Sequence, residues 1–194
     1  MAEGGCLVRS NSDSIMDNLQ IRLLQRNDIQ EIAAAFAALG WNKPTSQYDR
    51  YYREQAAVER VVLVARLDKI FAGYVTIVWE SPYPFFWKED IPEIVDFNVL
   101  PQFRRKGIGT ELLDEAEERI SQRSPIAGIG VGMMADYGAA QILYVKRGYI
   151  PDGRGLIKEG RPLSYGDQVS INDELVLYFT KQLSTPPQTP TKER

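Results

Sequence analysis

The feature that most limits how this chain can fold is a basic, glycine-containing run, Arg104 to Thr110, with the sequence Arg-Arg-Lys-Gly-Ile-Gly-Thr. A largely apolar, strand-like segment, Glu93 to Leu100, precedes it. From Gly107 to about Gln122 the apolar residues recur at helical spacing, which predicts a helix. The first N–H groups of a helix are unpaired, and glycine lets a ligand come close to them. Strand, basic turn and helix together predict a phosphate site.

Two common nucleotide-binding motifs do not fit this run. A Walker A loop would need Gly-Lys-Ser or Gly-Lys-Thr at a fixed spacing, and neither follows. A dinucleotide fingerprint would need a third glycine where the chain has Leu112. Cations at a helix N-terminus are electrostatically disfavoured unless an anion joins them. We therefore expect Arg104, Arg105 and Lys106 to bind an anion of another kind.

Composition excludes several classes of chemistry. The 194 residues include no histidine, so no Ser-His-Asp triad, Cys-His pair or His-ligated metal site can form, and no metal is expected. The single cysteine, Cys6, allows no disulfide within the chain. A net charge of −3 does not favour nucleic-acid binding. Without a long apolar run or a secretory signal, we expect no membrane span and a cytoplasmic protein.

The sequence predicts one folded domain, residues 19–183, between a flexible leader, residues 1–18, and a disordered tail, residues 184–194. Within the domain we expect a strand, two helices, a hairpin, an aromatic loop, a strand, a helix, a strand, a helix and final antiparallel strands. In chain order these span about 19–24, 28–40, 45–58, 60–80, 81–92, 94–100, 107–122, 126–133, 136–147 and 149–182.

This order, with the basic turn Arg-x-x-Gly-x-Gly, resembles the GCN5-related N-acetyltransferase (GNAT) superfamily. The resemblance implies an α/β (α+β) fold with a mixed central sheet of about six to seven strands flanked by about four helices. It also implies acetyl-CoA as co-substrate, with its pantetheine arm on the backbone of Phe97, Asn98 and Val99. The residues implied in binding its pyrophosphate are Arg104, Arg105, Lys106, Gly107, Ile108, Gly109 and Thr110.

A second segment, Ala139 to Tyr149, resembles another motif of the family, an Ala-x-x-Leu-Tyr helix that ends in Gly-Phe or Gly-Tyr. In the family the tyrosine of this helix commonly protonates the departing thiolate, and here it is Tyr144. Many members carry an asparagine that contacts the cofactor three residues before the second alanine, and this chain has Tyr137 there.

The general base that deprotonates the acceptor amine must be an Asp, Glu, Tyr or Lys side chain, a chain terminus or a water, because the chain has no histidine. Glu93 is the first candidate, since it lies fourteen residues before Gly107, the spacing of the base in GNAT histone acetyltransferases. Asp96 and Glu80 are the alternatives, and a water is another. On an unbroken strand Glu93 and Asp96 would point to opposite sides, and a β-bulge would change that.

The acceptor is expected to be a small-molecule or peptide amine. The loop from Trp79 to Trp87 is rich in aromatic side chains and is flanked by carboxylates, which suits a cation. The alternative interpretation of this loop is a small hydrophobic cluster or a dimer contact. Because the fold often dimerises, a homodimer is one candidate assembly. The residues implied in acceptor binding are Trp41, Trp79, Glu80 and Tyr83.

Three functions fit these patterns. The first is an acetyl-CoA-dependent N-acetyltransferase that moves the acetyl group directly to a small amine or a lysine side chain. The second is a GNAT-fold protein that binds acyl-CoA as a sensor or has lost catalysis, a reading kept open because Tyr137 replaces the asparagine. The third is a nucleotide-binding module with a different phosphate ligand.

Overall fold

Helices and strands are interspersed along the chain in the computed structural model, which describes residues 18–183. The predicted leader, apart from Asn18, and the predicted tail lie outside the described residues. The strands are β1 Leu19–Leu23, β2 Arg60–Leu67, β3 Ile70–Val78, β4 Glu93–Val99, β5 Ile126–Gly132, β6 Ile150–Lys158, β7 Arg161–Pro162 and β8 Leu175–Gln182. The α-helices are α2 Asp28–Ala37, α3 Thr45–Ala56, α4 Pro84–Lys88, α5 Ile108–Ser121 and α6 Gly138–Lys146, and short 3₁₀ turns span Pro101–Phe103 and Ala135–Tyr137.

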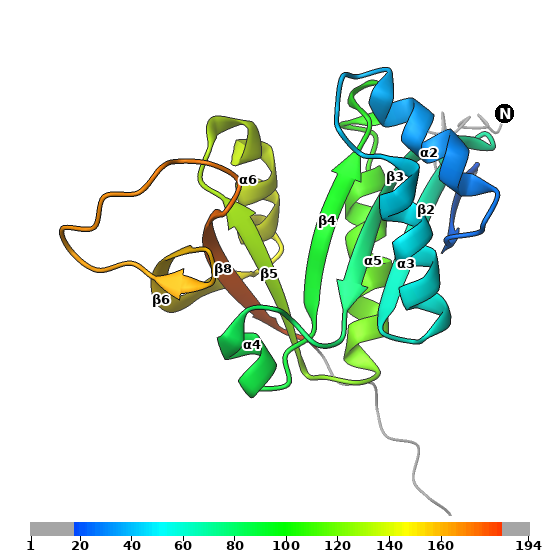
Figure 1. Ribbon diagram of the computed structural model, residues 1–194. Helices are drawn as coiled ribbons and strands as arrows, with labels where there is room; N and C mark the ends of the chain where they lie inside the picture. Colours follow the sequence, from blue (N-terminus) through cyan, green and yellow to red (C-terminus); the bar gives the residue numbers. More distant parts are fainter. Residues whose placement is uncertain (1–17, 184–194) are drawn as a thin grey trace, which may run out of the picture.

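The strands form one mixed sheet in the order β1-β2-β3-β4-β5-β8-β6-β7. Neighbouring strands are antiparallel except β4 and β5, which run parallel. In Figure 1, β2, β3 and β4 form one half of the molecule with α2, α3 and α5, whereas β5, β8 and β6 form the other half with α6. The parallel pair is therefore the junction between the two halves.

The predicted α/β fold is confirmed, with more elements than the sequence indicated. The described residues form eight strands, where six to seven were expected, because the final antiparallel region contains the two-residue strand β7. A tight turn at Glu159 and Gly160, both with positive φ, folds β7 back on β6. A fifth helix, α4, occupies part of the predicted loop 81–92, with Pro84 in its first turn, where a missing N–H costs little.

Two apolar clusters cover the two faces of the β1–β4 half. On one face α5 packs its buried residues, such as Leu112 and Ala116, against Ile77 and Ile94 of the sheet. On the other face α2 and α3 pack Phe36 and Tyr48 against neighbours that include Tyr74. Alternation along each strand sends successive side chains to opposite faces, which are called here the α5 face and the α3 face.

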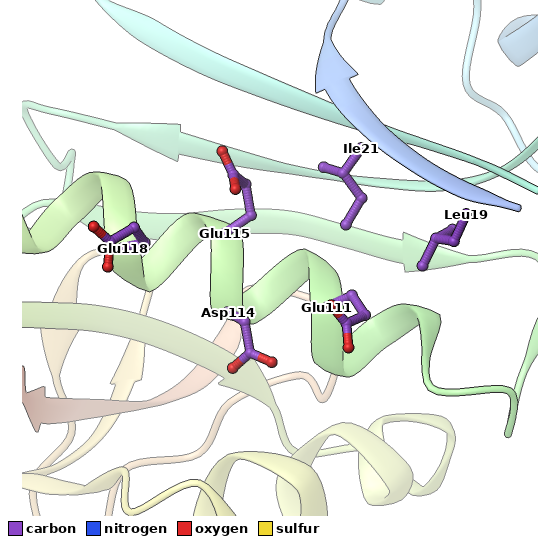
Figure 2. Close-up of a pocket in the computed structure, with 6 residues that line it drawn as sticks. All are labelled: Leu19, Ile21, Glu111, Asp114, Glu115 and Glu118. Atoms are coloured by element: carbon purple, nitrogen blue, oxygen red, sulfur yellow. The ribbon is translucent and has the colours of Figure 1, made fainter. Parts of the chain in front are cut away.

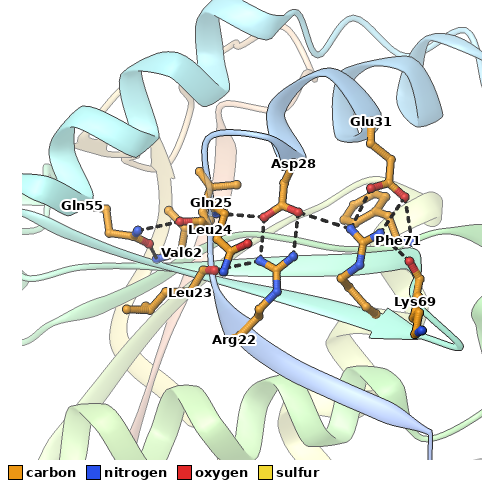
Figure 3. A network of polar contacts seen from close by, with 11 residues as sticks. Arg22, Leu23, Leu24, Gln25, Asp28, Glu31, Gln55, Val62, Lys69 and Phe71 are labelled. Atoms are coloured by element: carbon orange, nitrogen blue, oxygen red, sulfur yellow. Dashed lines mark hydrogen bonds and ion pairs between the residues drawn. The ribbon is translucent and has the colours of Figure 1, made fainter.

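A network of ion pairs fastens the start of α2 to the edge of the sheet (Figure 3). The buried carboxylate of Asp28 accepts hydrogen bonds from Arg22 at 2.6 and 2.7 Å and from the backbone N–H of Gln25 at 2.8 Å, and Arg66 approaches it at 3.3 Å. Burial raises the pKa of Asp28, but these partners outweigh it and hold the pKa below its ordinary value. Asp28 therefore carries a structural negative charge at the β1 edge.

Candidate active site

A β-bulge interrupts β4 in its middle. Thr76 pairs with Val95 and Tyr74 pairs with Asn98, so one residue of β3 faces two residues of β4. Asp96 lies in this extra step with φ 50°, a left-handed conformation that is uncommon outside glycine. The strand therefore changes its alternation between Val95 and Phe97.

The bulge places both candidate carboxylates of β4 on one face. Ile94 packs on the α5 face, so its neighbour Glu93 lies on the α3 face. Beyond the bulge, Phe97 and Val99 pack on the α5 face. Asp96 points to the α3 face, where it accepts hydrogen bonds from α3. The arrangement expected for an unbroken strand, with Glu93 and Asp96 on opposite sides, does not occur.

The strands β4 and β5 part soon after they meet. Only Glu93 with Gly128 and Ile94 with Ile129 are paired, although both strands continue beyond these residues. Figure 1 shows the two arrows diverging from this point. Along residues 95–99, the β4 backbone therefore has no strand partner from the described part of the chain on the side toward β5, and its N–H and C=O groups there can bond a ligand.

The predicted phosphate turn follows directly at the end of this strand. Gly107 takes φ 83° and precedes α5, and its carbonyl accepts from Thr110 and Glu111 at 2.9 and 3.1 Å. Within the part of the chain that the structure describes, the backbone N–H groups of residues 105–109 donate to no acceptor. Five consecutive unpaired donors at a helix N-terminus are suited to bind an anion, and these five N–H groups are called here the anion cradle.

Side chains around the turn fix its position on the sheet. A Cβ on Gly109 would lie 3.1 Å from Cζ of Phe97, so the absent side chain lets α5 approach β4 closely. Arg104 Nε donates to the Val99 carbonyl at 3.1 Å. Arg104, Arg105 and Lys106 are all exposed. The turn therefore presents positive charge while its backbone is held against β4.

Glu93 is a buried carboxylate with few partners. Its side chain is only 4% exposed in the folded chain. Ser81 Oγ donates a hydrogen bond to Glu93 Oε2 at 2.5 Å. Burial raises the pKa of Glu93 to about 7, although the Ser81 hydrogen bond and the charge of Arg60 act to lower it. A carboxyl group with this pKa takes and releases a proton near neutral pH.

The two other candidate bases have different surroundings. The Asp96 carboxylate is occupied by donors, and although burial raises its pKa, the Lys43 ion pair and the donated hydrogen bonds hold the pKa below its ordinary value. Glu80 is exposed just after β3. Of the three carboxylates, only Glu93 combines deep burial with a raised pKa.

Tyr144 and Tyr137 follow β5 in the chain and lie on the β5 side of the point where β4 and β5 diverge. Tyr144 of α6 is buried in the cluster on the α5 face, and burial raises its pKa well above the ordinary value, so the phenol is protonated at neutral pH. The Tyr137 ring packs so closely on Gly132 that a Cβ there would meet it at 2.6 Å. Its hydroxyl donates to Asp173 Oδ1 at 3.1 Å. The tyrosine in the asparagine position is thus tied to the loop before β8.

The four residues predicted for the acceptor do not form one surface. Trp41 is 37% exposed and stacks on Phe36 at 5.6 Å, at the end of α2. Trp79 packs on the other face, where Arg123 lies 4.0 Å from its ring. Tyr83 stacks on Tyr178 at 3.8 Å and donates its hydroxyl to Asp152 at 2.8 Å. The aromatic loop therefore forms mainly a hydrophobic cluster between α4, β6 and β8.

Three polar residues of the site were missed by the sequence reasoning. Ser81 bonds Glu93, Arg60 donates to Thr76 at 2.7 Å beside β4, and Lys43 bonds Asp96 at 2.5 Å. Each of these residues either is far from its partner along the chain or lies in a segment that the sequence pattern predicted to be a loop. Only the Ser-Pro pair at 81–82, a turn signal, marked one of these positions.

A groove of about 610 Å³ lies elsewhere, between β1 and α5 (Figure 2). Its lining consists of Leu19, Ile21, Glu111, Asp114, Glu115 and Glu118. The carboxylates along α5 would repel a polyphosphate, so this groove is unsuited to the ligand that the turn predicts. Residues 18–183 contain no group of three or more Cys, Asp or Glu side chains arranged to hold a metal ion. Over the same residues, every helix is too short or too polar to span a membrane.

Comparison with known proteins identifies the family. The model of the acetyltransferase (GNAT) family matches residues 26–149, more than half of the chain. The chain belongs to the GNAT family of acetyltransferases. The matched segment contains the bulged strand, the phosphate turn and the α6 helix, so the resemblance seen in the sequence is confirmed. The GNAT family uses acetyl-CoA as the acetyl donor, which agrees with the anion cradle.

Solved structures share the GNAT fold at low sequence identity. An N-acetyltransferase from Staphylococcus aureus is 15% identical with a TM-score of 0.64, and the match covers 86% of this chain and 99% of that one. YncA from Salmonella typhimurium, solved with its cofactor acetyl-CoA, is 16% identical with a TM-score of 0.61, and the match covers 90% of this chain and 99% of that one. A spermidine N-acetyltransferase chimera from Vibrio cholerae and hSSAT is 15% identical with a TM-score of 0.62, and the match covers 85% of this chain and 95% of that one. A search of curated protein sequences finds no match.

The raised pKa of Glu93 predicts an unusual dependence of stability on pH. The folded state holds this proton up to about pH 7, whereas the unfolded chain releases it near the ordinary pKa of 4.5. Between these values the folded state binds more protons, so the free energy of unfolding falls as pH rises. In Glu93→Gln this fall should be smaller by about 1–3 kcal/mol, measured by urea unfolding across this range.

Glu118→Gln is the matched control, because it removes the same charge from an exposed position of α5. The control should keep the pH dependence of the wild type. If the stability difference between Glu93→Gln and wild type were the same at both ends of the range, the raised pKa would be wrong.

Proposed function

We propose that this protein is an acetyl-CoA-dependent N-acetyltransferase that transfers the acetyl group directly to a primary amine, either a small molecule or a lysine side chain. The observation that supports this most is the set of five N–H groups at residues 105–109 that have no acceptor within residues 18–183, directly after a strand whose backbone is open toward β5. Acetyl-CoA has a pyrophosphate and a pantetheine arm, which match these two features in that order.

The anion cradle would bind the pyrophosphate by backbone hydrogen bonds and by charge. Arg104, Arg105 and Lys106 supply cations beside the cradle, and the α5 dipole adds partial positive charge. The backbone of residues 97–99 would bond the amides of the pantetheine arm. When bound, acetyl-CoA supplies an acetyl group activated as a thioester, and the protein's own residues handle the two protons of the transfer.

Glu93 is the proposed general base. A primary amine with pKa about 10.4 is unprotonated in only about one molecule in a few thousand at neutral pH, so a base must take its proton. The pKa of Glu93, raised by burial to about 7, matches that task. Because the side chain is 4% exposed, a water would carry the proton from the amine to the carboxylate.

Tyr144 is the proposed general acid. Its phenol keeps its proton because burial raises its pKa, and it lies on the α5 face, opposite the face that holds Glu93. A base on one face and an acid on the other suit a direct transfer, in which the amine arrives on one side of the acetyl carbon and the thiolate departs on another. Tyr137 would contact the cofactor near Tyr144 in place of the usual asparagine.

The acceptor would approach from the α3 face, where Glu93 lies. Among the residues predicted for acceptor binding, Trp41 and Glu80 keep exposed side chains, and both can contact a cationic amine. Tyr83 is held by its stacking on Tyr178, and its backbone N–H donates to Ser81 Oγ at 3.0 Å, so it would shape the surroundings of Glu93. Trp79 packs on the α5 face and is the weakest of the four candidates.

Two measurements on the wild-type protein test the function. Acetyl-CoA and CoA should raise the melting temperature, whereas ATP and NAD should raise it less. With acetyl-CoA present, a thiol-release assay should detect turnover with at least one amine from a panel of polyamines, monoamines and lysine peptides. Tight CoA binding with a silent panel would support the acyl-CoA sensor instead. Stabilisation by ATP or NAD alone would contradict both readings.

The pH dependence of kcat/KM should reflect the ionisation of the Glu93 carboxyl group. Activity should rise with pH through about 7, the pKa to which burial raises this carboxyl group, because the carboxylate is the active form. Glu93→Gln should lose this acid limb. Ser81→Ala should move the limb to higher pH, because it removes a hydrogen bond that lowers the pKa of Glu93. An acid limb that neither variant changes would remove Glu93 from the role of base.

Replacement of Tyr144 by phenylalanine should lower kcat by about 100-fold and leave acetyl-CoA affinity unchanged, because only the transferable proton is removed. Tyr149→Phe is the matched control. The Tyr149 ring is buried 6.0 Å from that of Tyr144, and its hydroxyl has no hydrogen-bond partner among residues 18–183. The control should keep the wild-type kcat. Equal kcat for both variants would contradict the acid role of Tyr144.

A further inference from the structure

Asp96 is the most heavily hydrogen-bonded carboxylate of the candidate site. Five donors reach its two oxygens, from β4 itself, from β3, from α3 and from the connection between α2 and α3. They are Lys43 Nζ at 2.5 Å, Tyr74 Oη at 2.5 Å, and Gln47 Nε2, Tyr51 Oη and Asn98 Nδ2 at 2.9 Å each.

These bonds occur at the bulge and not along regular strand. A non-glycine residue at φ 50° is strained and persists only when its surroundings hold it. Lys43 also donates to Tyr74 Oη at 3.1 Å and lies 5.6 Å from the centre of that ring, so the cation is itself fixed. The network therefore has the geometry needed to hold the β4 backbone in its bulged form.

The bulge in turn determines how the cofactor strand meets the phosphate turn. It directs Phe97 and Val99 to the α5 face. There the Phe97 ring limits the approach of Gly109, and the Val99 carbonyl accepts from Arg104. A change in backbone conformation at Asp96 would move both contacts, and with them the five N–H groups of the anion cradle.

We propose that Asp96 is a positioning residue for acetyl-CoA: its five hydrogen bonds hold the β4 bulge, and the bulge sets the strand backbone and the phosphate turn in one binding geometry. Asp96 touches neither the reacting atoms nor the cofactor in this role. The inference rests on the proposed binding of acetyl-CoA.

Calorimetric titration with acetyl-CoA alone tests this without an acceptor. Asp96→Asn keeps the size of the side chain but loses the charge and cannot accept from all five donors. We expect its acetyl-CoA Kd to rise about tenfold. Asp28→Asn is the matched control, since Asp28 is another buried carboxylate on an arginine network, at the edge of the sheet (Figure 3). It should lose stability and keep the wild-type Kd.

Lys43→Met is a second variant that leaves the strand sequence intact, should Asp96→Asn fold poorly. It should raise the Kd in the same direction, and the double variant should bind no more weakly than Asp96→Asn, because both changes act on one network. If folded Asp96→Asn and Lys43→Met both bind as tightly as Asp28→Asn, the inference is overturned. If the wild type binds no acetyl-CoA, the proposed function fails, and this inference with it.

Discussion

The hydrogen bonds that converge on Asp96 hold the backbone conformation on which the candidate site depends. At the bulge, two residues of β4 lie opposite one residue of β3. The residues after the bulge therefore point to the opposite face from the one that regular alternation would give them. Without it, Phe97 and Val99 would leave the α5 face, where they pack against the start of α5. The side chains that donate to Asp96 come from β3, from α3 and from the connection between α2 and α3, as well as from β4 itself. Sheet, α3 and phosphate turn are therefore coupled through a single carboxylate.

The local parts of the site could be predicted from the sequence. The turn at Gly107 and the helix that follows it are encoded within a few residues, because glycine, basic residues and helical spacing act at short range. The α6 helix with Tyr144 was found in the same way, although its N-cap is Tyr137 and the predicted Asp136 lies in a 3₁₀ turn. Strand β7 was not found, because two residues carry no periodic signal.

The parts that depend on distant contacts could not be predicted. The carboxylate at the bulge is bonded by Lys43, which lies 53 residues from Asp96 along the chain, and no local pattern indicates that pairing. The aromatic loop was expected to contact the acceptor, with a hydrophobic cluster as the alternative. Composition could not decide between the two, because it does not show the direction in which each ring points. In the structure Tyr83 and Phe86 pack against Tyr178 of β8, a contact fixed by strand order. Tertiary packing determined the orientation of these side chains, and the sequence pattern was consistent with either outcome.

Glu93 and Asp96 show how one strand gives two carboxylates opposite properties. Both lie on the α3 face and both are largely buried, so desolvation raises the pKa of each. Asp96 has the ammonium of Lys43 at 2.5 Å, and its pKa falls below the ordinary value. Within residues 18–183, the Glu93 carboxyl group is bonded by one hydroxyl, and its pKa rises to about 7. A cation bonded to Glu93 would remove its affinity for a proton near neutral pH. The absence of such a partner among residues 18–183 costs stability above that pH, and it leaves Glu93 able to take a proton near neutral pH, as the proposed general base must.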